Sequence, residues 1–499
     1  SVESSNVLGS LTGVRSSQQP SGVRLFGTDL GWTFEHNGML QIMLGDSWSK
    51  PDALCDVLTQ GFPDHDDTQG YLPRRYTGGV PSITLATEPD ARGEFAKTLV
   101  YRDGELLRTS QNAGPMTAFS DGQRAIAIYQ ATTFASCSAG TCPAPFECAP
   151  QIGQCQPPFL GVPANCDLAA ENACLDGQTC EPVGAGFCVD PGVPLADVTQ
   201  RVALELELAV QRPSEPTHFD SRHTFISNRF INMTARTVRR LSAYGRSDYR
   251  RGDGDLLLWG RPAFNSSEQN NQPLYLLTHK LPFTAAPSGE LDFHPRYFAG
   301  VDGRGRPIWS DSQAEAKPLA LDGKVDGDPR ELLPVLNQLT VTWLDAPIRR
   351  WVMFYGGASP LDPNGPPTAA IGGIEPGAIA VRYAEHPWGP WSPPQTLLAP
   401  GAPDVEDSLY GPGGFLYHPA CADTATKSCT RSDPARYSAL LNNSCEPEAP
   451  SPDYGYLYAA GIIEPYTERT DDGFNVYWTV SSWNPYVTLF VKSHIRATQ

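Results

Sequence analysis

Residues 27–48 read GTDLGWTFEHNGMLQIMLGDSW, with two apolar runs on either side of an Asn-Gly dipeptide. Asn37-Gly38 is a strong hairpin signal, because both central residues of a type I′ turn need φ > 0 and these residue types tolerate it. Apolar residues occupy both faces of the two runs, which is typical of strands packed between neighbouring layers. The stretch therefore predicts a buried β-hairpin near the start of an all-β chain.

Other segments resemble this hairpin. MLQIMLGDSW (39–48), DLLLWGRPAF (255–264) and RWVMFYGGAS (350–359) each run from apolar residues through glycine into a loop. Repeated units of this kind are typical of β-propeller blades. The spacing predicts an all-β, five-bladed β-propeller over residues 22–499, with a β-sandwich as the competing architecture. The blades are expected at residues 22–110, 111–245, 246–325, 326–405 and 406–499.

The net charge of the 499-residue chain is −18, which excludes some classes of function. An acidic surface opposes the phosphate contacts on which nucleic-acid binding depends, and no segment is rich in Lys and Arg. No run of about 18 or more apolar residues is present, so no transmembrane segment is expected. Residues 1–21 contain many Ser and Gln and are expected to form a flexible N-terminal segment.

Twelve cysteines predict disulfide bonds and an oxidising compartment. Their number is even and no Cys-x-x-Cys pair suggests zinc. We therefore expect a secreted protein, either extracellular, periplasmic or on the outer surface of a bacterium, and a start without Met fits a removed signal peptide. The twelve candidates for pairing are Cys55, Cys137, Cys142, Cys148, Cys155, Cys166, Cys174, Cys180, Cys188, Cys421, Cys429 and Cys445.

Residues 137–188 hold eight of these cysteines and are expected to form an insert within the second blade. Two units of four cysteines follow each other, and each is too small to fold on an apolar core alone, so two bridges are expected in each. Three pairings are possible within each unit. The insert is interpreted either as a spacing or protective element or as a docking site for a surface partner.

Asp29 and Asp46 lie at equal distances from the expected turn. With the turn at residues 37–38, Asp29 is expected to face Asp46 directly, with Cβ atoms ~4.5–5.5 Å apart. Like charges that face each other destabilise a sheet. Burial is expected to raise the pKa values of the two carboxyl groups, and their proximity couples the two titrations. Glycoside hydrolysis needs such a pair, one carboxyl as acid and one as base or nucleophile. In the structural alternative, the two aspartates bond turn and loop amides.

Four segments together resemble a family of secreted bacterial five-bladed β-propellers that includes endo-D-arabinanases (glycoside hydrolase family 183). They are GTDLGWTFEHNGMLQIMLGDSW, LLLWGRPAF, LTVTWLDAPIRRWVMFYGG and YWTVSSWNPYVTLFVKSH. The resemblance covers most of residues 22–496 apart from the cysteine-rich insert. It implies that the aspartates of GTD and GDS, which are Asp29 and Asp46 here, are the catalytic carboxylates, and that the polysaccharide substrate is a D-arabinan.

The chain departs from the family in its loops, which determine specificity in propellers. A long acidic segment, SKPDALCDVLTQGFPDHDDTQG, follows the second aspartate, and the eight-cysteine insert is not part of the family's core. Another furanoside or an acidic glycan therefore stays open as the substrate. The chemistry requires no organic cofactor. The alternative function is a non-catalytic β-propeller that binds a glycan or a surface partner.

Further residues are candidates for substrate binding. Trp32 and Trp483 offer rings on which sugars stack, and Arg261 offers donors for sugar hydroxyls. His418 and Asn484 lie in expected loops. Each has a structural alternative: core packing for the tryptophans, pairing with a carboxylate for Arg261, a loop role for His418 and a turn start for Asn484.

Three other features have weaker links to function. Glu464 is a reserve carboxylate should Asp29 or Asp46 be structural, and His279 is interpreted as a core or loop histidine. The acidic segment after the hairpin has oxygen ligands suited to calcium, but its spacing does not match a calcium-binding loop, so a solvated loop is favoured and no metal site is predicted. Its aspartates are Asp52, Asp56, Asp64, Asp66 and Asp67.

Overall fold

In the computed structural model, the regular secondary structure of the described residues is almost entirely β-strand. It also includes short helical turns such as η4 (Gln313–Glu315) and η6 (Glu464–Tyr466). The described residues are 1–12, 25, 27–48, 66–87, 95–107, 115–130, 147–149, 154–156, 179–181, 187–189, 204–227, 229–230, 232–238, 254–261, 274–320, 336–356, 378–400, 402, 405, 408–409, 414–415, 457–482 and 487–497.

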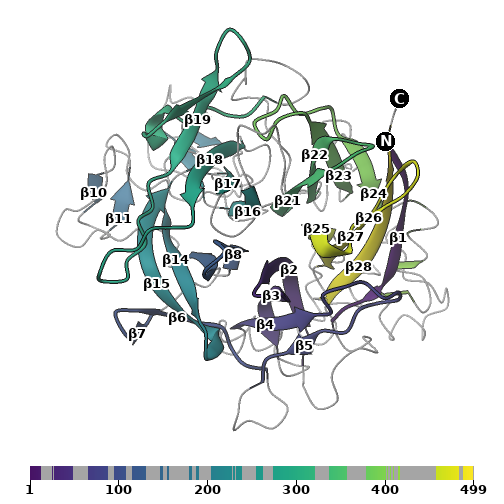
Figure 1. The fold of residues 1–499 in the computed structure, drawn as a ribbon, viewed down its shortest axis with the longest axis horizontal. Coiled ribbons are helices and arrows are strands. Elements are labelled where there is room, and N and C mark those ends of the chain that lie inside the picture. Colours follow the sequence, from purple (N-terminus) through teal and green to yellow (C-terminus); the bar gives the residue numbers. More distant parts are fainter. Residues whose placement is uncertain are drawn as a thin grey trace. The chain divides into compact units, whose positions relative to one another are not determined.

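Five sheets of four to six strands follow one another along the chain (Figure 1). The first contains β2 (Gly27–His36), β3 (Met39–Trp48), β4 (Asp66–Leu72) and β5 (Thr84–Leu85), in that order. The second contains β7 (Glu105–Leu106), β6 (Leu99–Arg102), β15 (Glu215–Ser227), β14 (Leu204–Arg212), β9 (Ala125–Gln130) and β8 (Pro115–Ser120). The third contains β16 (Asn232–Val238), β17 (Gly254–Arg261), β18 (Tyr275–Leu281), β19 (Arg296–Val301) and β20 (Pro307–Ser310).

The fourth sheet contains β21 (Leu336–Leu344), β22 (Arg350–Gly356), β23 (Ile379–Ala384) and β24 (Gln395–Leu398). The fifth contains β1 (Val2–Ser10), β28 (Val487–Arg496), β27 (Gly473–Ser482) and β25 (Leu457–Ile462), and β26 (Glu468–Arg469) also pairs with β27. Successive meandering sheets of this kind are the blades of a propeller. The predicted all-β, five-bladed β-propeller is confirmed.

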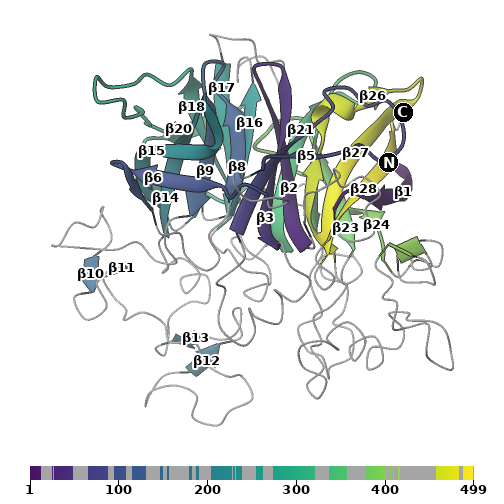
Figure 2. The same ribbon diagram turned by 90° about the horizontal axis from the view of Figure 1, so that it is seen from below.

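The last blade is closed by the first strand, so residues 2–10 form a strand where a flexible segment was expected over residues 1–21. Strand β1 pairs antiparallel with β28 along its length (Figure 2). Ser1 and Arg496 exchange two hydrogen bonds of 2.8 Å, in which each backbone nitrogen donates to the other residue's carbonyl oxygen. A strand whose backbone groups are paired in this way is fixed in place, whatever its content of Ser.

Two expected blade boundaries also move. Strand β6 and the short β7 belong to the second sheet, where β6 lies beside β15, so the first blade ends before residue 99 rather than at 110. Strand β16 opens the third sheet, so this blade begins by residue 232 rather than at 246. Only four residues separate the end of β15 at Ser227 from the start of β16 at Asn232. The local pattern of a strand does not show to which sheet it pairs.

The chain divides into two compact units, each with its own apolar core. The first comprises Ser1–Leu99, Leu344–Arg382 and Pro394–Gln499, and the second comprises Val100–Trp343 and Tyr383–Pro393. In the first unit, Leu40, Ile42 and Leu44 of β3 are at most 1 % exposed and belong to one cluster of buried side chains. The hairpin at 27–48 is therefore buried as its apolar pattern predicted.

The predicted cysteine-rich segment contains two small hairpins of similar design. In one, β10 (Glu147–Ala149) pairs with β11 (Gln154–Gln156), and Cys148 lies opposite Cys155. In the other, β12 (Thr179–Glu181) pairs with β13 (Phe187–Val189), and Cys180 lies opposite Cys188. In both four-cysteine units, the last two cysteines thus lie opposite each other on the two strands of a hairpin. The predicted bridges themselves involve side chains outside the described part.

Candidate active site

The hairpin at residues 27–48 begins with the predicted register and then departs from it. Next to the turn, His36 pairs with Met39, and Trp32 pairs with Met43, as a turn at residues 37–38 requires. Beyond Trp32 the register shifts by one residue, so that Asp29 pairs with Gly45. The prediction that Asp29 faces Asp46 directly is therefore wrong by one position.

A β-bulge at Leu30 and Gly31 causes the shift. Leu30 has a φ of 65° and Gly31 a φ of 99°, both in the left-handed region, and the extra residue bends the strand there. Two side chains of β27 hold the bulge in place, because Ser481 donates to the carbonyl oxygen of Leu30 and Thr479 to that of Gly31, each at 3.1 Å. A glycine inside a strand is a known sign of a bulge.

Asp29 is buried beside this bulge, with 5 % of its surface exposed. The hydroxyl of Tyr458, on β25, donates a hydrogen bond of 2.8 Å to its Oδ2 atom. On the other side, Oδ1 lies against the backbone of Gly45: a Cβ atom built on Gly45 would lie only 2.7 Å from it. The carboxylate is thus held between the first strand of the first blade and the adjacent β25 of the last blade.

Asp46 follows Gly45 directly and is only half-buried. Its φ of 41° places it in the left-handed region, which aspartate tolerates better than most residues. Next to it, the hydroxyl of Thr28 donates to the carbonyl oxygen of Gly45 at 2.8 Å and lies 2.7 Å from the hydroxyl of Ser47. These contacts fix a second irregular segment of the hairpin. Between the Gly27–Trp48 and Asp29–Gly45 pairs, β2 has one residue, Thr28, and β3 has two, Asp46 and Ser47.

Backbone strain gathers around the two aspartates. Among the described residues, six other than glycine have a positive φ, and Asn37, Asp103 and Arg349 belong to turns or loops. The other three are Leu30, Asp46 and Ala459. Leu30 adjoins Asp29, and Ala459 adjoins its partner Tyr458, in a second bulge between Tyr458 and Gly461. Such conformations cost of order 1–3 kcal/mol each and cluster at functional sites.

Two of the predicted substrate contacts are buried. Trp32 is 5 % exposed and Arg261, on β17, is 1 % exposed. Stacking needs an open ring face, so the burial of Trp32 favours core packing for this residue. The role of Arg261 stays a prediction.

Glu464 lies away from Asp29, and His279 packs against an aromatic ring. Tyr458 of β25 contacts Asp29, and further along the same strand the carbonyl oxygen of Ile462 accepts a hydrogen bond of 3.3 Å from Thr33 of β2. Strand β25 therefore runs alongside β2 from Asp29 towards the hairpin turn, and Glu464 lies beyond its end on the turn side. At about 3.3 Å per residue, Glu464 is well beyond contact with Asp29. His279 is stacked on Phe283 with ring centroids 4.6 Å apart, and burial lowers its pKa.

Several predicted residues lie outside the described part of the chain. These are His418, Trp483 and Asn484, together with Cys55 and the acidic segment that follows the hairpin as far as Asp64. Their roles stay predictions.

Sequence reasoning missed Tyr458, which touches Asp29 although 429 positions separate the two residues. It also missed Thr479 and Ser481, whose hydroxyls hold the bulge. Thr479 and Ser481 lie within the segment YWTVSSWNPYVTLFVKSH, but its sequence does not show which neighbouring strand their hydroxyls contact. Tyr458 lies in none of the four quoted segments. The signal that was present is Gly31, an isolated glycine within a strand pattern.

No family model matches the chain, and no curated protein matches it. Solved structures with a similar fold include a GH43_1 enzyme from Xanthomonas citri, with 9 % identity, 94 % of this chain and 88 % of that chain covered, and a TM-score of 0.34. A structure reported for glycoside hydrolases of the GH130 family that target beta-1,2 mannosidic linkages in Candida mannan has 8 % identity, coverages of 99 % and 97 %, and a TM-score of 0.35. A Trypanosoma rangeli sialidase has 7 % identity, coverages of 98 % and 60 %, and a TM-score of 0.32. Likenesses this distant carry no argument about activity.

Proposed function

We propose that this chain is a glycoside hydrolase that cleaves furanosidic linkages within a polysaccharide, with Asp29 and Asp46 as its carboxylate pair. D-arabinan is the first substrate to test, because the sequence resembles a family that includes endo-D-arabinanases. The one observation on which the proposal depends most is the strained backbone around these two aspartates, at Leu30, Asp46 and Ala459. A pair of aspartates that only bonded turn amides would need no such strain on two neighbouring strands.

The two aspartates have the contrasting environments that this chemistry uses. Asp29 is buried and held by Tyr458. Asp46, which follows the pairing partner of Asp29, Gly45, is half-buried. Glycoside hydrolysis requires one carboxyl group that protonates the leaving oxygen and one carboxylate that activates water or attacks the sugar. Two carboxyl groups in different surroundings are suited to different roles in the same reaction.

Tyr458 gives Asp29 a fixed orientation. The hydroxyl that donates to Oδ2 restricts rotation of the Asp29 side chain. The oxygen on the other side, Oδ1, is confined by the backbone of Gly45. Positioning a reacting group in this way removes much of the entropic cost of reaching the transition state.

An exported protein is part of the same proposal. A polysaccharide substrate is found outside the cell, and twelve cysteines with an even count favour an oxidising compartment. Among the described residues, no helix has both the length and the apolar character needed to span a bilayer. The cysteine-rich insert is kept as a candidate docking element for a surface partner.

The proposal is tested by incubating the purified full-length chain with D-arabinan, arabinogalactan and a panel of other polysaccharides. Release of new reducing ends, with a rapid fall in chain length, is expected from D-arabinan or another furanoside. Release from a pyranoside alone would overturn the furanoside assignment. Binding to a glycan without any hydrolysis would instead favour the non-catalytic propeller.

A further inference from the structure

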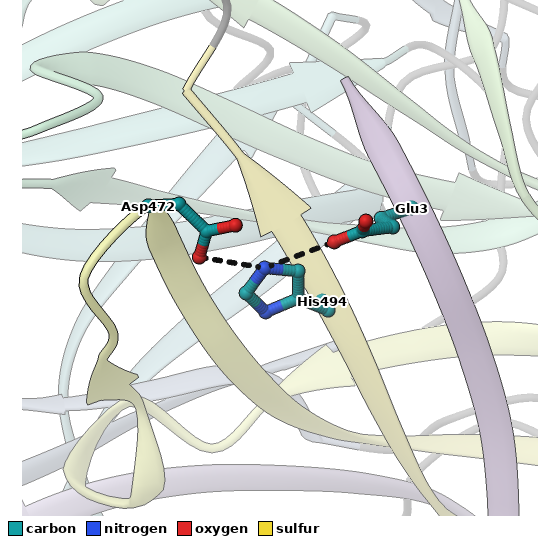
Figure 3. A group of neighbouring side chains, drawn as sticks. All are labelled: Glu3, Asp472 and His494. Atoms are coloured by element: carbon teal, nitrogen blue, oxygen red, sulfur yellow. Dashed lines mark ion pairs between the residues drawn. The ribbon is translucent and has the colours of Figure 1, made fainter.

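Three side chains from distant parts of the sequence meet on the last blade, far along the strands from the aspartates. Glu3 comes from β1, His494 from β28, and Asp472 from the turn before β27 (Figure 3). The Nε2 atom of His494 lies 3.3 Å from Oε2 of Glu3 and 3.2 Å from Oδ1 of Asp472. One oxygen or nitrogen of each residue lies within 4.8 Å of those of the other two.

Neighbouring residues fix the direction of these three groups. Arg496 takes the outer oxygen of each carboxylate: its Nη1 lies 3.3 Å from Oε1 of Glu3 and its Nε lies 3.1 Å from Oδ2 of Asp472. The inner oxygens are thereby left facing His494. Nδ1 of His494 lies 3.1 Å from Oδ1 of Asn475. In the neutral tautomer that donates from Nδ1 to this acceptor, the lone pair of the ring belongs to Nε2.

With His494 neutral, its Nε2 lone pair and one oxygen of each carboxylate converge on a point where a metal cation can bind. The two carboxylates outnumber the single guanidinium of Arg496, so the group as a whole attracts positive charge.

Two of the three separations between the ligand atoms match a tetrahedral transition-metal site, and the third lies within 4.8 Å. With metal–ligand bonds of about 2.0–2.1 Å, the ligand atoms of a tetrahedron lie about 3.3–3.4 Å apart. The two separations measured from Nε2 are 3.2 and 3.3 Å. One imidazole and two carboxylates form a donor set that suits zinc, whereas magnesium and calcium prefer oxygen ligands alone. Asn475 is placed as the outer partner that orients a metal-binding histidine.

We propose that Glu3, Asp472 and His494 bind a divalent transition-metal ion, with zinc as the favoured metal and water in the fourth position. The ion joins β1 to β28 and to the turn before β27. It therefore strengthens the contact between the first and last strands that closes the propeller. This site is separate from the proposed hydrolase chemistry and does not depend on it.

The test measures zinc binding to the full-length chain by isothermal titration calorimetry, together with the melting temperature with and without zinc. We expect His494→Gln to bind one zinc ion fewer than the wild type and to lose the rise in melting temperature that zinc produces. Asn475→Ala is expected to keep the site but to bind zinc about 10–100-fold more weakly. Glu3→Gln, at an exposed position, gives a second ligand variant should His494→Gln fold poorly.

His294→Gln is the matched control. His294 lies 2.7 Å from Asp292, so it is a histidine beside a single carboxylate, and 84 % of its side chain is exposed. This variant should bind as many zinc ions as the wild type. An equal number of zinc ions in the wild type and in His494→Gln, or no rise in melting temperature with zinc, would overturn the proposal and leave the group as an ion-paired cluster around a protonated histidine.

Discussion

The hydroxyl of Tyr458 donates a hydrogen bond of 2.8 Å to Oδ2 of Asp29. The two residues lie on β25 and β2, and each adjoins a residue with left-handed backbone, Ala459 and Leu30. Strain on both sides of one hydrogen bond indicates that the position of this carboxylate is under close control.

Tyr458→Phe is expected to lower kcat about 10–100-fold while leaving KM nearly unchanged. Loss of a hydrogen bond to a charged group costs about 1.5–3 kcal/mol, and each 1.4 kcal/mol is about a tenfold change in rate. Steady-state kinetics on D-arabinan provide the measurement.

Tyr466→Phe serves as the control for this variant. Tyr466 is equally buried and donates at 2.6 Å to the carbonyl oxygen of Pro73, so the substitution removes a comparable hydrogen bond elsewhere in the same unit. Equal losses of kcat in the two variants would show that Tyr458 acts through stability and not through Asp29.

Gly45→Ala is expected to abolish most activity and to destabilise the protein by about 1–3 kcal/mol, as overpacking does. The new Cβ would lie 2.7 Å from Oδ1 of Asp29 and 2.6 Å from Cδ1 of Leu30, so the carboxylate must move. Urea denaturation and kinetics measure the two effects. Gly303→Ala is the control, because a Cβ at Gly303 meets no atom within 4 Å. Full activity in Gly45→Ala would contradict the assigned role of Asp29.

The second unit should lose stability in mild acid. Burial lowers the pKa of His279 and of His223 below the ordinary value of 6.5. The unfolded chain then binds more protons than the folded chain as the pH falls below about 6.5, so stability is full above that pH and declines towards the folded pKa. His279→Phe, which keeps a ring against Phe283, should make the urea midpoint less dependent on pH between 7 and 5. An unchanged dependence would exclude His279 as a contributor.

The sequence could show the class of fold but not the register at the site. Asn37-Gly38 fixed the pairing as far as Trp32, because turn chemistry is local. The bulge at Leu30 depends on hydroxyls from β27, more than 440 positions away, which a local pattern does not contain. The one-residue shift of Asp29 was therefore beyond a prediction made from the hairpin alone.

The closing strand was missed for a similar reason. Residues 2–10 combine Ser, Asn and Gly with a few apolar residues, a composition that also suits a flexible segment. They form a strand because β28 offers an edge whose backbone groups need partners. Tyr458 likewise gains its role only from its place beside Asp29. Contacts between strands far apart in sequence decide both the closure and the site.

The most direct test compares the release of reducing ends from D-arabinan by the wild type, Asp29→Asn and Asp46→Asn. Each variant is expected to lose about 100-fold or more of kcat, the range that a general acid or base contributes, with its melting temperature little changed. Asp103→Asn, at a turn residue with a φ of 54°, controls for the exchange of Asp by Asn in left-handed backbone and should keep full activity. If Asp29→Asn and Asp46→Asn both turn over D-arabinan at the rate of the wild type, hydrolysis by this pair is contradicted.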